Sequence, residues 1–180
     1  MKGVRIPKER IAVFIGTNGS TKDFIESRLG VKLSIDAEGE VMLVKENEDD
    51  PFANLKVLDV VKAIGRGFSP QHAYRLLDEM EYLEVIDIKD YTSGKQTQLE
   101  RKRARVIGAN GKTRRLIEEL TGVSMSVYGS TVGLIGQPEQ VDVARRAIDM
   151  LLRGSEHSTV YRFLERSRPK LRVIEMGFEP

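Results

Sequence analysis

Apolar and polar residues alternate in several short stretches of the chain, a period that is typical of β-strands with one buried face. The clearest of these stretches are residues 31–35, 41–43, 123–127 and 132–134. In other stretches the apolar residues recur three or four positions apart, as on the buried face of an amphipathic helix. Stretches of this second kind are residues 24–29, 116–120 and 141–151. The pattern therefore predicts a fold of the α+β class.

The predicted elements run in the same order twice: strand, helix, helix, strand, strand, helix. The opening strand and helix of the two copies are expected at residues 4–6 and 8–14 and at residues 82–88 and 96–106. The second helix of each copy should end at a glycine, Gly30 or Gly122, because helices commonly finish with a glycine in the left-handed conformation. Pro51 and Pro138 suit the first position of the two closing helices. A duplicated fold is therefore expected.

A direct sequence repeat supports this duplication. Residues 15–35 align with residues 107–127 without a gap, and ten of the 21 positions are identical. The offset of 92 residues is too long for a solenoid repeat and has the size of a small domain. Each copy contains a Gly-x-x-Gly turn between its first two helices, at Gly16–Gly19 and at Gly108–Gly111.

This order of elements, with a Gly-x-x-Gly turn between the first two helices, resembles the KH domain in its eukaryotic-type (type I) form. The resemblance implies two tandem domains, each a three-stranded antiparallel sheet covered by helices. The expected boundaries are residues 1–68 for the first domain, 69–81 for a connector helix, and 82–180 for the second domain with a C-terminal helical extension. In the connector, Ala73, Leu76, Leu77 and Met80 should share one apolar face, and the extension should be helical over about residues 158–166.

A Gly-x-x-Gly turn between two helices has a physical use in nucleic-acid binding. Glycine lacks Cβ and tolerates positive φ, so a sugar-phosphate backbone can approach the main chain closely. The helix that follows presents free N–H groups and the positive end of its dipole to phosphates. In KH domains the turn holds about four nucleotides of a single strand. By resemblance, the second groove would be lined by Arg103, Ile107, Leu116 and residues 123–128.

Charge distinguishes the two turns. The net charge of +2 is unevenly distributed. The first 92 residues contain 13 Lys/Arg and 17 Asp/Glu, and the rest of the chain contains 16 Lys/Arg and 10 Asp/Glu. Residues 101–115 contain seven cations and no acid, which predicts a phosphate-binding surface, with a solvated helix face as the alternative interpretation. The matching stretch of the first copy includes Glu9 and Asp23, and Ser20 stands where Lys112 does. The second turn is therefore expected to be the stronger RNA-binding site.

The predicted RNA-binding residues follow from the turns and the cations beside them. In the second copy they are Arg103, Arg105, Gly108, Ala109, Asn110, Gly111, Lys112, Arg114 and Arg115. In the first copy, as a weaker site, they are Gly16, Thr17, Asn18 and Gly19.

Two other functions fit single features of the sequence. The segment 111–113 resembles part of the phosphate-binding loop of nucleotide-dependent enzymes, but Val106 stands where that loop needs glycine, and a predicted helix precedes it instead of a strand. A protein-interaction scaffold, or a translation-associated adaptor with only one module on RNA, fits the acidic first half. The further Gly-x-x-Gly at Gly133–Gly136 has an apolar centre and lies on a predicted strand, so it is not counted as a binding turn.

The residue types that most catalytic and metal sites need are scarce. There is no cysteine, and the only histidines, His72 and His157, are expected at the surface or as caps. The acidic residues 46–50 are interpreted as a solvated loop, because no further metal-ligand set accompanies them. We therefore expect a non-enzymatic protein with no metal and no cofactor. Since no apolar run has the length of a membrane span and no signal-peptide core is present, a cytoplasmic protein without membrane contact is predicted.

The size of the chain, the connector helix and the segment Val-Ile-Gly-Ala-Asn-Gly-Lys-Thr at residues 106–113 are similar to the partner-of-Nob family of small-subunit ribosome assembly factors, in its compact archaeal form. This resemblance implies binding to single-stranded RNA near the 3′ end of small-subunit ribosomal RNA. It also implies two protein partners, a Nob-type endonuclease and the alpha subunit of translation initiation factor two. Eukaryotic members typically have a degenerate first turn, whereas Gly16–Gly19 is intact here, which favours an archaeal source.

Overall fold

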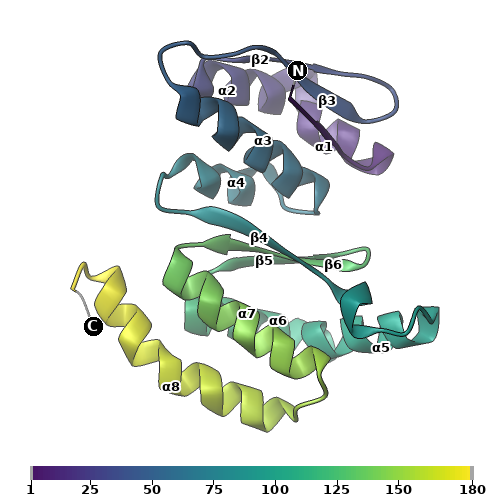
Figure 1. The fold of residues 1–180 in the computed structure, drawn as a ribbon, viewed down its shortest axis with the longest axis vertical. Coiled ribbons are helices and arrows are strands. Elements are labelled where there is room, and N and C mark those ends of the chain that lie inside the picture. Colours follow the sequence, from purple (N-terminus) through teal and green to yellow (C-terminus); the bar gives the residue numbers. More distant parts are fainter. Residues whose placement is uncertain (1, 179–180) are drawn as a thin grey trace. The chain divides into compact units, whose positions relative to one another are not determined.

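The computed structural model describes residues 2–178, and these form two compact units (Figure 1). The first unit is Met1–Glu79 and the second is Met80–Pro180. Each unit contains a three-stranded antiparallel sheet and a set of helices, so the predicted α+β class is confirmed. Within the described residues, no helix is both long and apolar enough to cross a membrane.

The first unit has the predicted order of elements. They are β1 (Gly3–Arg5), α1 (Ile11–Ile15, after a 3-10 turn at Lys8–Arg10), α2 (Ser20–Leu29), β2 (Lys32–Ile35), β3 (Glu40–Lys45), α3 (Pro51–Gly65) and α4 (Pro70–Ala73). The long strand β3 lies in the middle of the sheet, between β1 and β2. The core of this unit includes Phe14, Ile25 and Val57, which are fully buried. Each such side chain contributes about 1.5–3 kcal/mol through burial.

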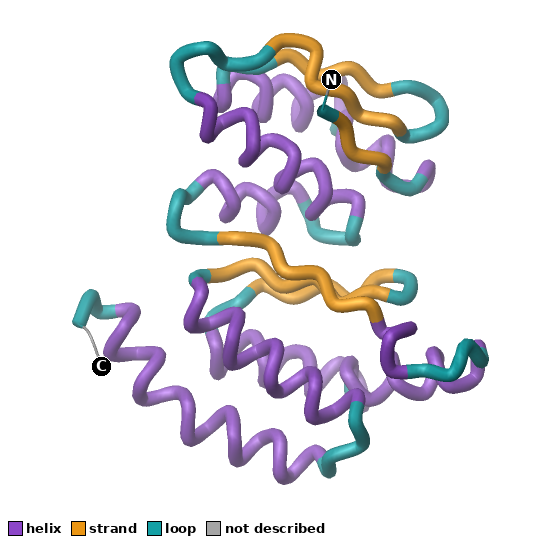
Figure 2. The backbone as a smooth tube through the Cα atoms, in the orientation of Figure 1, coloured by secondary structure: helices purple, strands orange, loops and turns teal. Residues whose placement is uncertain are grey.

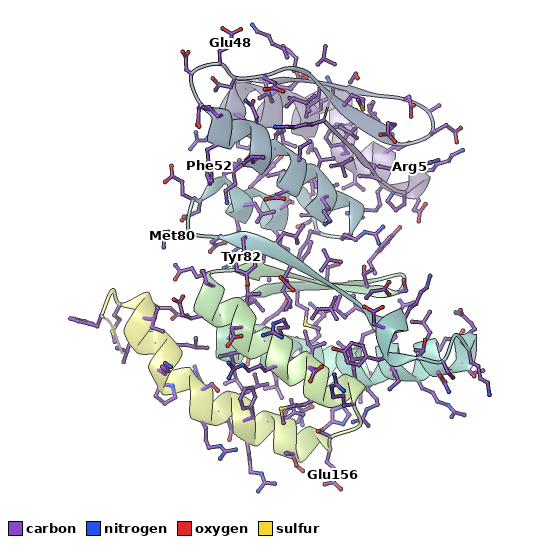
Figure 3. All side chains as sticks on the ribbon, viewed as in Figure 1. Arg5, Glu48, Phe52, Met80, Tyr82 and Glu156 are labelled. Carbon is purple, nitrogen blue, oxygen red and sulfur yellow. The ribbon has the colours of Figure 1, made fainter. Side chains whose placement is uncertain are left out.

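The predicted acidic loop before α3 caps that helix. The carboxylate of Asp50 accepts the N–H groups of Phe52 and Ala53 at 3.0 and 3.2 Å, and Pro51 occupies the first turn as predicted. Glu48, labelled in Figure 3, is an exposed member of this loop. The run of acids thus includes an N-terminal cap that stabilises α3.

The predicted connector helix is shorter than expected and belongs to the first unit. Helix α4 passes into a 3-10 turn at Tyr74–Leu77, and the chain then becomes extended at Asp78. Ala73 and Leu76 are fully buried, as their spacing predicts, but Met80 lies beyond the helix and is 64% exposed. Including Met80 in the apolar face was therefore wrong, because the helical turn ends before it.

The second unit repeats the order strand, helix, helix, strand, strand, helix, and a long helix, α8, follows where the first unit has the short α4. Its elements are β4 (Tyr82–Asp87), α5 (Gln96–Ile107), α6 (Lys112–Thr121), β5 (Ser124–Tyr128), β6 (Thr131–Gly136), α7 (Pro138–Leu152) and α8 (His157–Glu175). Strand β6 is central, between β4 and β5, and α6 and α7 cover one face of the sheet (Figure 2). The apolar Gly133–Gly136 segment lies within β6, as predicted.

Helix α8 is longer than the sequence indicated. The apolar spacing predicts a helix over about 158–166, and a proline such as Pro169 usually ends a helix. The helix instead continues through Pro169 to Glu175 and packs on both α6 and α7 (Figure 1). Leu164 before the proline and Leu171 after it are both buried, so packing on both sides offsets the lost hydrogen bond.

A glutamate carboxylate, buried at Glu26 and half-buried at Glu118, ties the second helix to the sheet in each unit. Glu26 accepts the N–H of Leu33 at 2.8 Å, and the equivalent Glu118 accepts the N–H of Met125 at 3.0 Å. Burial by itself would raise the pKa of Glu26, but the Leu33 N–H and the nearby lysine ammonium groups outweigh it and lower the pKa. The helix that follows each Gly-x-x-Gly turn is thereby fixed to the strand beside it.

Candidate nucleic-acid interface

The two Gly-x-x-Gly turns have nearly the same backbone. The first glycine has φ 76° and ψ 172° at Gly16, and φ 76° and ψ 170° at Gly108. The asparagine at the third position is left-handed in both, with φ 53° at Asn18 and φ 55° at Asn110. This conformation is uncommon for a residue with a side chain, and asparagine is among the residues that tolerate it best. The repeat seen in the sequence is therefore a repeat of conformation.

The two glycines of the second turn serve different purposes. A Cβ on Gly108 would overlap Oγ1 of Thr113, so this glycine permits the close packing of the turn on α6. A Cβ on Gly111 would meet only Nη1 of Arg115, at 3.9 Å, so the surface over this glycine is open. Gly111 is also the N-cap of α6 and has no side chain to cover the first N–H groups of the helix. The turn thus presents bare backbone and a helix N-terminus to an approaching phosphate.

Charges at equivalent positions differ between the turns. Arg115 stands beside Gly111, whereas the equivalent Asp23 places a carboxylate oxygen 3.5 Å from where a Cβ of Gly19 would lie. A phosphate at the first turn would therefore meet a negative charge, and one at the second turn would meet a positive one. The cations one position earlier, Lys22 and Arg114, pair with glutamates of their own helix in both units.

Part of the predicted basic cluster has a structural task. The guanidinium of Arg105 donates to the carbonyl oxygens of Leu151, at 3.1 Å, and of Ser155, and Lys102 donates to the carbonyl of Leu152 at 2.5 Å. These cations satisfy carbonyl groups at the C-terminus of α7, where positive charge is favourable.

The first unit uses Arg10 in the same way. Its guanidinium donates to the carbonyls of Ile64, at 2.8 Å, and Phe68, at 2.7 Å, at the end of α3. The cation at the end of the closing helix is thus a shared feature of the two units. A direct RNA contact by Arg105 stays a prediction, and its observed contacts favour a role in the fold.

The remaining predicted cations lie around the turn. Arg103 is partly exposed on α5, while Lys112 and Arg115 are exposed on α6. In the described part of the chain none of these three side chains forms an ion pair. The two helices that flank the turn therefore carry three uncompensated cations, and Ala109 and Asn110 are exposed between these helices.

The predicted groove wall is only partly available. Ile107 and Leu116 are half-buried beside the turn, but Val123 and Met125 lie in the core and are 3% and 5% exposed. Because side chains alternate along a strand, these two face the helices and offer little surface to a ligand.

Tyr161, which the sequence did not single out, and His157, which it placed at the surface or as a cap, support the second turn from α8. The hydroxyl of Tyr161 forms a hydrogen bond of 2.8 Å with Oγ1 of Thr113, the side chain that packs under Gly108. Nζ of Lys112 lies over the Tyr161 ring, 5.8 Å from its centroid. His157, one turn earlier, forms a 3.0 Å hydrogen bond through Nε2 with the carbonyl of Arg105. Helix α8 therefore contacts both helices that flank the turn. The only sequence signal for this was the apolar spacing that predicts a helix over about 158–166.

Known proteins resemble this chain in sequence and structure. A family model for the eukaryotic-type KH-domain (KH-domain type I) matches residues 82–169. A KH domain-containing protein of Methanocaldococcus jannaschii is 49% identical over 170 residues, covering 94% of this chain and 74% of that protein. The chain belongs to the KH-domain family. The family resemblance drawn from the sequence is thereby confirmed.

Two further relatives are of the partner-of-Nob type, PNO1 or Dim2p. The pre-rRNA-processing protein PNO1 of Debaryomyces hansenii is 30% identical over 136 residues, which cover 74% of this chain but only 53% of that protein. The chain thus spans about half the length of such eukaryotic relatives. The crystal structure of a complex of a/eIF2alpha, aDim2p and rRNA from Pyrococcus horikoshii contains a chain that is 50% identical, with a TM-score of 0.86 and 93% of both chains covered.

Proposed function

We propose that this protein binds single-stranded RNA of the small ribosomal subunit, near the 3′ end of that RNA, chiefly through its second KH module and without cleaving it. The bare backbone of Gly108–Gly111 beside uncompensated cations carries the proposal. Relatives named for RNA binding and pre-rRNA processing, and a relative crystallised with rRNA, support the choice of RNA. The named residues Arg103, Lys112 and Arg115 would contact phosphates, and the turn would hold the backbone of about four nucleotides.

The turn can be tested by placing negative charge on it. Ala109 and Asn110 are exposed, so the double variant Ala109→Asp and Asn110→Asp adds two carboxylates against the phosphates without disturbing the core. We expect the affinity for single-stranded RNA to fall at least about 100-fold, while the far-ultraviolet circular dichroism spectrum is unchanged. An unchanged affinity would remove the turn from the binding site.

Salt dependence provides an independent check on the same site. If about four phosphates are engaged, the logarithm of the affinity should fall with the logarithm of salt concentration at a slope of roughly −3. A slope near zero would mean that no phosphates are neutralised, and the RNA proposal would fail.

The first KH module is proposed to serve a partner more than RNA. Asp23 beside its turn disfavours phosphate, and Phe24, 45% exposed, packs against Tyr74 with ring centroids 4.6 Å apart and ring planes tilted by 43°. An exposed aromatic pair suits a protein contact. The complex of the Pyrococcus relative with a/eIF2alpha makes the alpha subunit of that initiation factor the first partner to test. A Nob-type endonuclease, which would perform the cleavage, and a cytoplasmic location follow from the family resemblance.

The domain division is proposed at the end of the first unit. The segment 69–79 packs with α3, so a first domain that includes it would be the unit to express alone. The expected result is a folded fragment of residues 1–79, checked by circular dichroism.

A further inference from the structure

Helix α8 carries a set of cations, four exposed and Arg168 partly exposed, that its supporting role does not explain. Its five basic residues are Arg162, Arg166, Arg168, Lys170 and Arg172. Within residues 2–178 none of the five has an acidic partner. The two acids of the helix are Glu165 and Glu175, and Glu175 accepts a hydrogen bond from Gln140 at 2.9 Å. The helix therefore has a net positive surface along its length.

The neighbouring helix α7 shows the opposite arrangement. Its arginines Arg145 and Arg146 both pair with Asp142, at 2.9 and 3.0 Å, and Arg153 pairs with Asp149 at 3.0 Å. Positive charge on α7 is thus compensated within the helix itself. The uncompensated charge of α8 is a local feature and does not reflect the general composition of this half.

Three of the α8 cations form a regular row. Arg162, Arg166 and Lys170 are spaced four residues apart and are exposed, so they follow one another at about 6 Å along the same side of the helix. This spacing is close to that between successive phosphates of an extended strand. Arg166 and Lys170 also border a groove of about 450 Å³ between α7 and α8.

The row begins close to the second Gly-x-x-Gly turn. Arg162 follows Tyr161, whose hydroxyl is bonded to Thr113 and whose ring lies under Lys112. From this point α8 runs for about two turns to Lys170 along the outer side of α6 and α7 (Figure 1). The first residue before the helix, Glu156, is labelled in Figure 3 at the end of α8 opposite the C-terminus.

We propose that the row Arg162, Arg166 and Lys170 is a second RNA-backbone surface, which binds the part of the RNA strand that extends beyond the nucleotides held at Gly108–Gly111. The proposal rests on the proposed function of the turn. Contacts of this kind are made by charge alone and carry no base preference. Within α8 no large apolar side chain is exposed, and the exposed Met176 and Phe178 lie past its end, beyond Lys170. Because protein interfaces usually have apolar residues at their centre, the row itself fits RNA better than an acidic protein partner.

The test compares two RNA lengths and two sets of neutralised cations. The row variant is Arg162→Gln, Arg166→Gln and Lys170→Gln. The control is Arg145→Gln with Arg153→Gln, two paired arginines that do not border the groove beside Arg166 and Lys170. The probes are an oligonucleotide of about four nucleotides, which fills only the turn, and one of about 15 nucleotides that can also reach α8. Melting temperatures verify that the variants are folded.

The row variant should bind the short RNA as the unchanged protein does and the long RNA about tenfold more weakly, with a salt slope shallower by about 2. The control should bind both RNAs normally, because its arginines are already paired. Arg162→Lys with Arg166→Lys keeps the charges and should keep the affinity for the long RNA.

Equal affinity of the row variant and the unchanged protein for the long RNA would overturn the proposal, as would an equal loss for both lengths. If the unchanged protein bound neither RNA, the proposed function of the turn would fail first. The two failures are therefore distinguishable.

Discussion

The support of the second turn by α8 makes a quantitative prediction about Tyr161. Thr113 is 1% exposed, and its hydroxyl is bonded to the Tyr161 hydroxyl at 2.8 Å. Tyr161→Phe keeps the ring and removes this bond, so a buried hydroxyl is left without its tyrosine partner. Such a loss costs about 1–3 kcal/mol. For a unit of this size, each 1 kcal/mol lowers the melting temperature by roughly 4–8 °C.

A double-mutant cycle separates the bond from other effects of the substitution. Urea unfolding would be measured for Tyr161→Phe, Thr113→Val and the double variant, followed by circular dichroism. If the bond is the cause, Tyr161→Phe should cost about 1–3 kcal/mol in the natural background and much less when Thr113 is already valine. The RNA affinity of Tyr161→Phe should also fall, because Thr113 packs under Gly108. Equal costs of Tyr161→Phe in both backgrounds would refute this reasoning.

Two other features give predictions of their own. Gly108→Ala should destabilise the second unit by at least about 1–3 kcal/mol, because the backbone has positive φ and the new Cβ would also overlap Thr113. Gly111→Ala shares the strain of positive φ but meets open space, so it should cost less in thermal unfolding. Glu26→Gln should destabilise the first unit at neutral pH. Because the folded pKa of Glu26 lies below its ordinary value of 4.5, the carboxylate stabilises the fold above that pH, and this contribution is lost as the pH falls through the folded pKa. Urea unfolding of both proteins over this pH range should show the difference between them disappearing in acid, and a difference that persisted would show that Glu26 acts by packing alone.

The repeated fold could be predicted because the relevant signals are local. Alternating apolar residues and the glycines at Gly30 and Gly122 mark strands and helix ends directly. A gap-free repeat then links two stretches of sequence without knowledge of their contacts. The left-handed asparagines are likewise a consequence of the shared Asn-Gly pair.

The sequence was less informative about features that depend on contacts between residues far apart in the chain. Helix α8 continues through Pro169, and Leu171, two residues after the proline, is buried. No local sequence pattern indicates that Leu171 is buried. Arg105 counts as a cation in the sequence, but its carbonyl partners on α7 are 46 and 50 residues away. Tyr161 supports Thr113 across 48 residues. Charged and aromatic residues can therefore be identified in the sequence, but the contacts that they make depend on the fold.

The central claim is that the second turn provides most of the RNA binding, although both turns share one backbone conformation. The most direct measurement is a titration of one single-stranded ribosomal RNA fragment with two paired variants. The first variant is Thr17→Asp with Asn18→Asp, and the second is Ala109→Asp with Asn110→Asp. We predict that the second variant loses at least about 100-fold in affinity and the first only a few-fold. An equal loss in the two variants, or a larger loss in the first, would contradict the account.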